Sequence, residues 1–315
     1  MSAEPSGEED AREIVWRGMT RAQVAAQYNP QVAVPDPARY GRENREASAT
    51  ARARLQGALD VRYGPGPRQL LDVFPARDTV LAQGGLAPVL IFVHGGGWRT
   101  LDKSVYSFIA PPWSDAGVVT VLPGYGLLPD VSLVRMMDEV REAIAWVAAH
   151  AREYGGDPER IVVAGMSAGA QLSGMALAHA PSAGVIKAAA LASSVYDLDA
   201  HRWHGRHTDM GLDEALVAKA SPLHNPPLDR ALPMSLSVGA EETSELIRQT
   251  RDYHAALQSR GQPVRLIVEP GRHHLSMGRV FADPGSATFQ AILQMIRNLA
   301  GVTRTSGTPP RETTS

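Results

Sequence analysis

The sequence predicts an α/β protein, with a doubly wound, mostly parallel sheet, helices on both faces and a small cap. From about residue 58, short apolar segments alternate with longer amphipathic segments. The later short segments are continuously apolar, as expected of parallel strands that are buried on both faces. The chain has 315 residues, of which 44% are hydrophobic, so it can bury one large core. We therefore expect a single domain spanning 11–302.

Polar tails flank this domain. Residues 1–10 and 303–315 show no periodic apolar pattern. We expect both tails to be disordered, because they offer too little apolar surface to offset the entropy lost on ordering. Within the domain, 11–55 is predicted to be a helical arm packed on the sheet. The segment 197–230 is predicted to be an insertion that forms part of the cap.

Two helical segments are predicted in the arm. Thr20 and Gln23 have the spacing of a capping box, in which two side chains satisfy backbone amides of the first helical turn. Residues 45–55 are rich in strong helix formers. The arm is therefore expected to begin with a short capped helix and to end with a longer one.

Strands and helices alternate through the rest of the predicted domain. The candidate strands span residues 58–64, 69–75, 88–94, 117–123, 160–165, 185–193, 233–239 and 264–270. Candidate helices between and after the later strands span residues 131–154, 244–260 and 286–300. Leu133, Met137 and Val140 share one face of the first helix, which indicates packing against the sheet. This alternation is typical of doubly wound sheets.

Composition and charge exclude several classes of function. The formal net charge is −2 and the arginines are scattered among acids, so nothing indicates a nucleic-acid or anionic-membrane partner. The absence of cysteine excludes disulfides, thiolate metal sites and a cysteine nucleophile. The sequence shows neither a secretory signal nor the ~18 uninterrupted apolar residues of a membrane span. We expect a cytoplasmic protein and leave its oligomeric state open, with a homodimer as one alternative.

A Gly-x-Ser-x-Gly pattern at 165–169 supplies the candidate nucleophile, Ser167. The alternative is a structural role, in which the pattern forms a close-packed corner between a strand and a helix. The pattern follows a buried-type strand and opens an apolar helix, the arrangement in which a sharp elbow exposes a serine hydroxyl above the sheet. The amide of Ala168 would then face the oxyanion of a tetrahedral intermediate, next to the helix N-terminus.

The sequence HGGGW at 94–98 directly follows another predicted strand. A simple glycine turn is the alternative interpretation, but three glycines between His and Trp exceed what one turn needs. Such a loop supplies oxyanion-hole amides in lipases and esterases, because glycine allows close approach of the backbone. We expect Gly96 and Gly97 to be these donors, His94 to brace the loop and Trp98 to line the substrate pocket.

Serine chemistry needs a base, which in this arrangement follows the last strand. His273 and His274 lie there, and we prefer His274 because the adjacent Leu275 can anchor the loop. Other histidines lie on predicted helices, where a surface or structural role is ordinary. They are His150, His179 and His254.

The acid that orients the base is expected after the preceding strand, where several carboxylates compete. Glu242 is preferred over Glu241 because of its spacing from Gly239, and Glu245 is better placed to begin the next helix. Asp197, which follows the strand before, is the main rival.

One histidine cluster raises the possibility of a metal. His201, His204 and His207 could ligate zinc, but Gly205 interrupts their spacing, so they are not firmly on one helix face. We favour a polar loop of the cap and expect no metal. Neither a dinucleotide-binding loop nor a Walker phosphate loop occurs, so no cofactor is expected.

Several stretches together resemble the α/β-hydrolase group that includes kynurenine formamidase (arylformamidase) and its esterase relatives. They are HGGGWRTLDKSVYSFIA, GYGLLPDVSL, GMSAGAQLSG and GAEETSELIRQ. The resemblance implies a serine hydrolase that cleaves a carboxylic ester or formamide through an acyl-enzyme. It assigns the nucleophile to Ser167, the acid to Glu242 and the base to His274.

Two positions depart from the family's pattern. The family usually has aspartate where Glu242 stands, and relatives often carry arginine where Gly126 stands. These changes bear on the substrate and leave the reaction class intact. Our first hypothesis is hydrolysis of an aryl formamide of the N-formylkynurenine type. The alternatives are a carboxylesterase for short-chain or aromatic esters and, more remotely, a non-catalytic small-molecule receptor.

Overall fold

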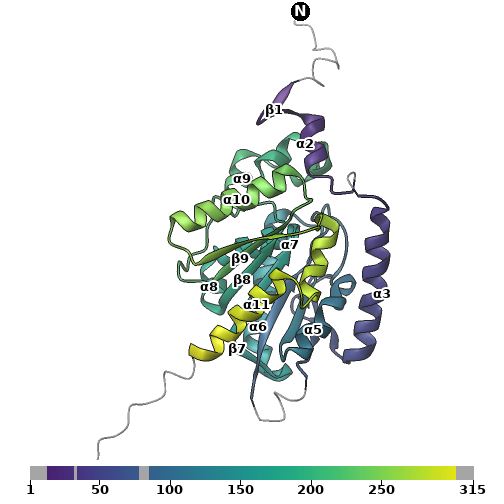
Figure 1. Ribbon diagram of the computed structural model, residues 1–315, viewed down its shortest axis with the longest axis vertical. Coiled ribbons are helices and arrows are strands. Elements are labelled where there is room, and N and C mark those ends of the chain that lie inside the picture. The colour runs from purple at the N-terminus through teal and green to yellow at the C-terminus, as the bar shows by residue number, and fades with distance from the viewer. Residues whose placement is uncertain (1–12, 32–33, 78–84, 303–315) are drawn as a thin grey trace, which may run out of the picture.

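The computed structural model describes residues 13–31, 34–77 and 85–302 of the chain. An eight-stranded sheet forms the centre of the molecule, and helices cover both faces (Figure 1). The predicted fold class is confirmed. The tails predicted to be disordered, 1–10 and 303–315, lie outside the described residues.

All the strands predicted for the sheet are present. The strands of the molecule are β1 (Ile14–Trp16), β2 (Met19–Thr20), β3 (Ala58–Arg62), β4 (Leu70–Phe74), β5 (Ala87–Val93), β6 (Val119–Pro123), β7 (Gly156–Met166), β8 (Ile186–Ala192), β9 (Met234–Gly239) and β10 (Val264–Glu269). Their order in the sheet is β10-β9-β8-β7-β5-β6-β4-β3, and β1 pairs with β2 separately. Strands β5 to β10 are parallel, whereas β3 and β4 are antiparallel at one edge. The parallel strands therefore end at one common edge of the sheet.

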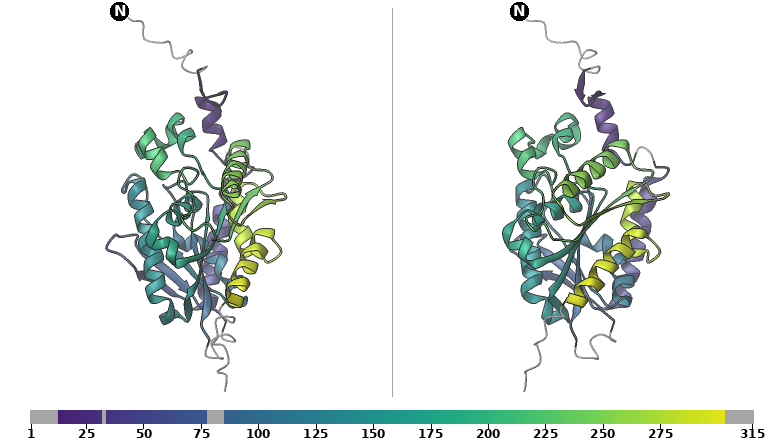
Figure 2. Two further views of the ribbon diagram at one scale, coloured as in Figure 1. Left: turned by 90° about the vertical axis from the view of Figure 1, so that its left-hand side faces the viewer. Right: turned by 60° about the vertical axis from the view of Figure 1, so that its left-hand side comes forward.

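Helices form a layer on each side of the sheet (Figure 2). The α-helices are α2 (Arg21–Gln27), α3 (Pro37–Leu55), α5 (Ala110–Asp115), α6 (Leu133–His150), α7 (Ala168–Leu177), α8 (Ala180–Val185), α9 (Glu214–Ala220), α10 (Ser244–Ser259) and α11 (Ala287–Val302). The 3-10 helices are η1 (Lys103–Ile109), η2 (Ala151–Tyr154), η3 (Asp199–Trp203), η4 (Gly205–Met210) and η5 (His274–Ala282). Helices α6, α7 and α10 share one apolar core, and α5, α11, η1 and η5 share the other. No helix in the described ranges is long and apolar enough to cross a bilayer.

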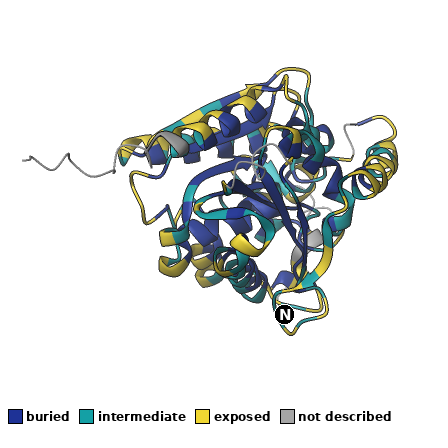
Figure 3. Cartoon of the chain, turned by 90° about the horizontal axis from the view of Figure 1, so that it is seen from below, coloured by how far each residue is buried: buried dark blue, intermediate teal, exposed yellow. Residues whose placement is uncertain are grey.

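The two cores explain why the parallel strands are continuously apolar. In β5, Val89, Ile91 and Val93 enter the core beneath α6 and α7, whereas Leu90 and Phe92 enter the opposite core. All five side chains are fully buried. Figure 3 shows the buried strands inside helices whose outer surfaces are exposed. A charged residue within such a strand would be desolvated on either face, so we expect charged functional groups where the strands end.

Capping residues decide where the predicted helices begin. Thr20 Oγ1 accepts a hydrogen bond from the Gln23 amide at 3.4 Å, and Gln23 Oε1 accepts one from the Thr20 amide at 2.8 Å, so the predicted capping box is confirmed. The second arm helix starts at Pro37, earlier than predicted, because proline fits the first helical turn. The Ser132 hydroxyl caps α6 by accepting from the Arg135 amide at 3.2 Å.

A buried ion network fastens the arm to the sheet. Asp72 on β4 is fully buried, and its Oδ1 lies 2.7 Å from Lys103 Nζ on η1. Its Oδ2 lies 2.7 Å from the guanidinium of Arg52 on α3. Lys103 also contacts Asp60 on β3 at 2.6 Å. One carboxylate therefore joins the arm helix, two edge strands and the helix after the glycine loop.

Removing the lysine tests this network. In Lys103→Met, Asp72 keeps Arg52 but loses its closest buried counter-charge, so we expect a loss of about 3 kcal/mol or more in the free energy of unfolding. The matched control is Lys187→Met, because Lys187 Nζ lies 3.6 Å from an exposed carboxylate, that of Glu159, and such pairs contribute less than about 1 kcal/mol. Urea denaturation monitored by circular dichroism gives both values. Equal losses in the two variants would contradict the network's importance.

Candidate active site

Ser167 lies at the sharp junction between β7 and α7. Its backbone has φ 54° and ψ −123°, a left-handed conformation that is unusual for a residue with a side chain. The Ser167 amide donates to the carbonyl of Ala192, at the end of β8, at 2.9 Å. Strained backbone of this kind persists where the surroundings enforce it, and it is concentrated at functional sites. The junction holds the hydroxyl above the edge where the parallel strands end.

The glycine after the serine permits this junction. A Cβ built on Gly169 would lie 2.1 Å from the carbonyl oxygen of Val93 and 2.3 Å from that of His94. Helix α7 therefore begins in direct contact with the end of β5. Gly165 is equally constrained, because its Cβ would lie 2.6 Å from the Gly169 carbonyl oxygen. Both glycines of the Gly-x-Ser-x-Gly pattern are required by close approach of the backbone.

The structure brings Ser167, His274 and Glu242 together. His274, the first residue of η5, places Nε2 3.0 Å from Ser167 Oγ. Its Nδ1 lies 2.7 Å from Glu242 Oε2. Because an ionised carboxylate can only accept, Nδ1 carries the proton and Nε2 is free to accept the serine proton. Glu242 has no exposed side-chain surface, and the His274 side chain is 12% exposed. The three residues can therefore abstract and return a proton at Ser167.

The Glu242 carboxylate is held at its other oxygen as well. The hydroxyl of Ser193, just after β8, donates to Oε1, and the amide of Gly239 donates to the same atom at 2.9 Å. Ser193 was missed by the sequence reasoning, which considered this stretch only for Asp197. A serine after a buried strand is too common to indicate the contact.

The other predicted acids belong to different networks. Glu245 pairs with Arg248 at 2.7 Å, and this pairing lowers the pKa of its carboxyl against the opposing effect of burial. Asp197 accepts from the Asp199 amide at 3.0 Å. Glu241 is exposed. Among the carboxylates of the described residues, only Glu242 approaches the His274 ring within hydrogen-bonding distance.

His273 points away from Ser167 and towards the arm. Its Nε2 lies 2.8 Å from the hydroxyl of Tyr40 on α3, and the two rings meet edge to face at 4.9 Å. Burial lowers the pKa of His273, so the neutral ring is favoured. Adjacent histidines thus have separate partners, one in the arm and one at Ser167.

The HGGGW loop lies against the Ser167 elbow. A Cβ on Gly95 would lie 3.2 Å from Ser167 Cβ. Gly96 and Gly97 have φ of 129° and 59°, which side chains disfavour. Within the described part of the chain, the amides of Gly96, Gly97 and Ala168 donate to none of the backbone carbonyls in turns and loops. Their role as oxyanion donors stays a prediction.

Contacts of two aromatic side chains, His94 and Trp98, hold this loop in place. His94 stacks on Tyr125 at 4.4 Å and on Tyr106 at 6.0 Å, and burial lowers its pKa to about 4, so it is neutral at pH 7. Trp98 is 2% exposed, and its Nε1 donates to Gln171 Oε1 on α7 at 2.9 Å. This contact gives Trp98 a bracing role, whereas its predicted contact with substrate stays a prediction.

The histidine-rich loop packs on the arm. His201 and His204 are each 3% exposed, and their rings lie 4.3 Å and 5.6 Å from the ring of Tyr28. Among the described residues no group of three His, Cys, Asp or Glu side chains has a metal-binding arrangement. The side chain of His207 lies outside the described residues.

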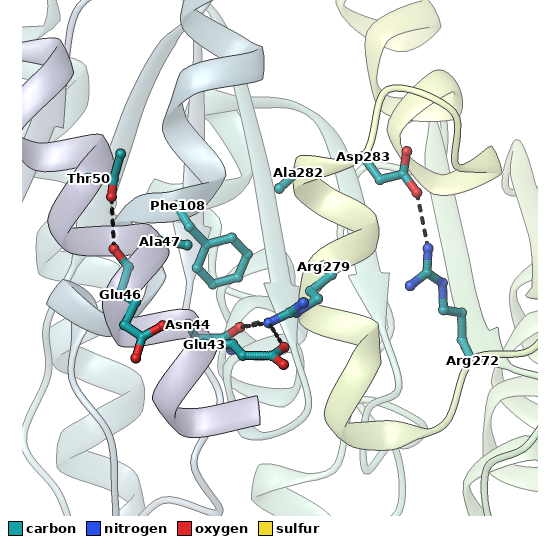
Figure 4. Close-up of a pocket in the computed structure, with 10 residues that line it drawn as sticks. All are labelled: Glu43, Asn44, Glu46, Ala47, Thr50, Phe108, Arg272, Arg279, Ala282 and Asp283. Atoms are coloured by element: carbon teal, nitrogen blue, oxygen red, sulfur yellow. Dashed lines mark hydrogen bonds and ion pairs between the residues drawn. The ribbon is translucent and has the colours of Figure 1, made fainter. Parts of the chain in front are cut away.

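A cavity of about 630 Å³ lies between α3 and η5, away from the Ser167 hydroxyl. In Figure 4, Phe108 lies near Arg279, which pairs with Glu43, and a second ion pair, Arg272 with Asp283, lies on the opposite side of the view. Their N–O distances are 2.7 Å and 3.0 Å, respectively. Both guanidinium groups that line the cavity are therefore paired with carboxylates.

The chain is similar to proteins of known family. A family model described as the alpha/beta hydrolase fold matches residues 90–277. Kynurenine formamidase of Salmo salar is 27% identical over 296 residues, which cover 89% of this chain and 98% of that protein. Esterase LipQ of Mycobacterium tuberculosis is 30% identical over 290 residues, which cover 84% of this chain and 66% of LipQ.

Solved structures share the architecture. A proposed thioesterase from Silicibacter sp. superposes with a TM-score of 0.74 at 24% identity, over 86% of this chain and 98% of that one. Esterase B from Lactobacillus rhamnosis gives a TM-score of 0.64 at 17% identity, over 88% and 97%. At these identities the similarity establishes the fold.

A methyl group at Gly169 tests the close approach that shapes the elbow. Gly169→Ala would force α7 away from the end of β5, so we expect a fall of several degrees in the melting temperature and loss of hydrolysis. Gly184→Ala is the control, since a Cβ at this helical glycine meets no atom within 4 Å; alanine there should be neutral or slightly stabilising. Differential scanning fluorimetry compares the two. A Gly169→Ala protein as stable as Gly184→Ala would contradict the proposed constraint.

Proposed function

Because the chain belongs to the α/β-hydrolase family, we propose that it is a serine hydrolase that cleaves a carboxylic ester or formamide bond through an acyl-enzyme at Ser167. The observation that supports this most directly is the continuous contact from Glu242 through His274 to Ser167. It matches a nucleophile, a base and an orienting acid in both order and geometry.

The reaction starts with the transfer of the Ser167 proton to His274 Nε2 as Oγ attacks the carbonyl carbon. The carbonyl electrons move to oxygen, and the amides of Gly96, Gly97 and Ala168 stabilise the oxyanion. Glu242 stabilises the imidazolium that forms. When the tetrahedral intermediate collapses, the C–N or C–O bond breaks and His274 gives its proton to the leaving group.

Water completes the cycle. His274 takes a proton from a water molecule, whose oxygen attacks the acyl-enzyme carbonyl and forms a second oxyanion in the same position. Collapse breaks the bond to Ser167 Oγ, which recovers its proton from His274. Trp98 would act mainly by holding the glycine loop at its distance from Ser167, through its bond to Gln171.

The first substrate class we propose is an aryl formamide of the N-formylkynurenine type. The kynurenine formamidases of Salmo salar and Danio rerio each align over 98% of their own length and 89% of this chain. The second is a short-chain or aromatic carboxylic ester. Similarity to esterase LipQ supports it, and an ester has the better leaving group. Formamidase and esterase relatives both argue against a non-catalytic receptor.

Replacing the acid tests the proposed triad. In Glu242→Gln, the amide can no longer act as the charged partner of Nδ1, so we expect kcat to fall roughly 10³- to 10⁴-fold. Asp197→Asn is the matched control, because this carboxylate contacts the Asp199 amide and lies 3.7 Å from His224. Steady-state kinetics with one substrate gives kcat for both variants and for the wild type. A large loss in Asp197→Asn with a small one in Glu242→Gln would move the acid to Asp197.

Substrate preference is tested by direct comparison of kcat/KM for N-formylkynurenine and for short-chain nitrophenyl esters. We expect efficient release of formate, because the similarity to formamidases spans nearly their whole length. Negligible formamide turnover beside rapid ester cleavage would select the carboxylesterase instead. Ser167→Ala is the common control and should lose roughly 10⁵-fold or more in kcat on either substrate. Wild-type activity in that variant would reject both proposals.

A further inference from the structure

We propose that Ser193 is a positioning residue for the reaction and fixes the Glu242 carboxylate in the orientation that His274 requires. This inference rests on the function proposed above. Ser193 follows β8, one strand away from Ser167 and one strand away from Glu242 in the sheet. It touches no reacting atom and acts through Glu242.

The first support is the set of bonds around the carboxylate. Oε2 of Glu242 accepts from His274, whereas Oε1 accepts from the Ser193 hydroxyl and the Gly239 amide. A buried carboxylate needs such donors, because desolvation otherwise disfavours its charge. Two donors from the ends of adjacent strands leave Oε2 facing the imidazole. Loss of either donor would allow the side chain to rotate about its last two bonds.

The second support is the backbone of Ser193. Its φ of 51° lies in the left-handed region, although the residue is not glycine. Its amide donates to the carbonyl of Ser237 on β9 at 2.8 Å, and the residue is fully buried. A serine is strained here, and glycine would not be. This backbone therefore prefers glycine, and what serine adds to glycine is a side chain that carries a hydroxyl.

The third support is the length of the acid. Glutamate has one more rotatable bond than aspartate, so its carboxylate explores more orientations unless something fixes it. The Gly239 backbone is closely packed on one side of this carboxylate, because a Cβ there would lie 2.1 Å from the Arg272 carbonyl oxygen and 3.2 Å from Glu242 Cγ. The Ser193 hydroxyl supplies the second fixed point that the longer side chain needs.

A double-mutant cycle tests the proposal. Ser193→Ala removes the hydroxyl and should lower kcat about 10- to 100-fold with little change in KM, the size expected for one hydrogen bond to a charged group. In a Glu242→Gln background the same substitution should change kcat less than about threefold, because the effect passes through the ionised acid. A merely structural serine would lower both backgrounds by the same factor, and that result would overturn the proposal.

Ser193→Gly separates the hydroxyl from the backbone. Glycine adopts the observed φ without strain, so it provides a folded variant even if Ser193→Ala unfolds. We expect Ser193→Gly to lose as much kcat as Ser193→Ala. Retention of kcat within twofold of the wild type would overturn the role of the hydroxyl. Ser235→Ala is the control, since this buried serine on β9 makes no side-chain hydrogen bond within the described chain.

Labelling with a fluorophosphonate separates this inference from the proposed function. Labelling of wild-type Ser167, together with equal effects of Ser193→Ala in both backgrounds, would overturn only the positioning role. No labelling of Ser167 would overturn the proposed function and this inference with it. Labelling, a kcat-specific loss in both Ser193 variants and a strongly non-additive cycle are the results expected if Ser193 positions Glu242.

Discussion

The left-handed backbone at Ser167 is the constraint on which the rest of the site depends. It exists because α7 starts within contact distance of β5, where Gly169 leaves no room for a side chain against Val93. The same approach brings the glycine loop beside the serine, since that loop continues β5. The proposed nucleophile and its candidate oxyanion donors are thus positioned by one packing contact. The strain is sustained by two buried cores, one on each side of the sheet.

The parallel sheet then distributes the remaining groups. Four neighbouring strands, β7, β8, β9 and β10, are each followed by one polar residue of the site. In that order these residues are Ser167, Ser193, Glu242 and His274. Most side chains of these strands are apolar and buried, so the polar groups of the site lie beyond the strand ends. Neighbouring strands are separated by about 5 Å, so Ser193 reaches Glu242 and Glu242 reaches His274. The loop after β10 brings His274 back across two strands to Ser167, so all four residues meet at one edge of the sheet.

The sequence was informative where the cause is local. The strands of the sheet, the Thr20 capping box and the Ser167 elbow are each encoded within a few residues. The carboxylate partner of His274 was harder to predict, because Glu242 and Asp197 both follow strands. Only the order of the strands in the sheet decides between them. Ser193 could not be found, since its role depends on how β8 and β9 are aligned. The choice between His273 and His274 depends on the direction of two side chains at the start of η5, which their order in the sequence does not reveal.

The arm extends the site beyond the sheet. Its longer helix contacts His273 through Tyr40, one residue before the base, and is itself anchored by the buried Asp72. Its first helix precedes Tyr28, whose ring packs on His201 in the cap region and whose hydroxyl accepts from Gln249 at 2.6 Å. Gln249 Oε1 also accepts from the backbone amide of Tyr196, three residues after Ser193, at 2.7 Å. Contacts from one arm therefore reach the segment that follows β8, near Glu242, and the loop that carries His274. An arm joined to both would limit the motion of Glu242 relative to His274, and the proposed proton transfer from Ser167 to His274 needs an imidazole that is held in place.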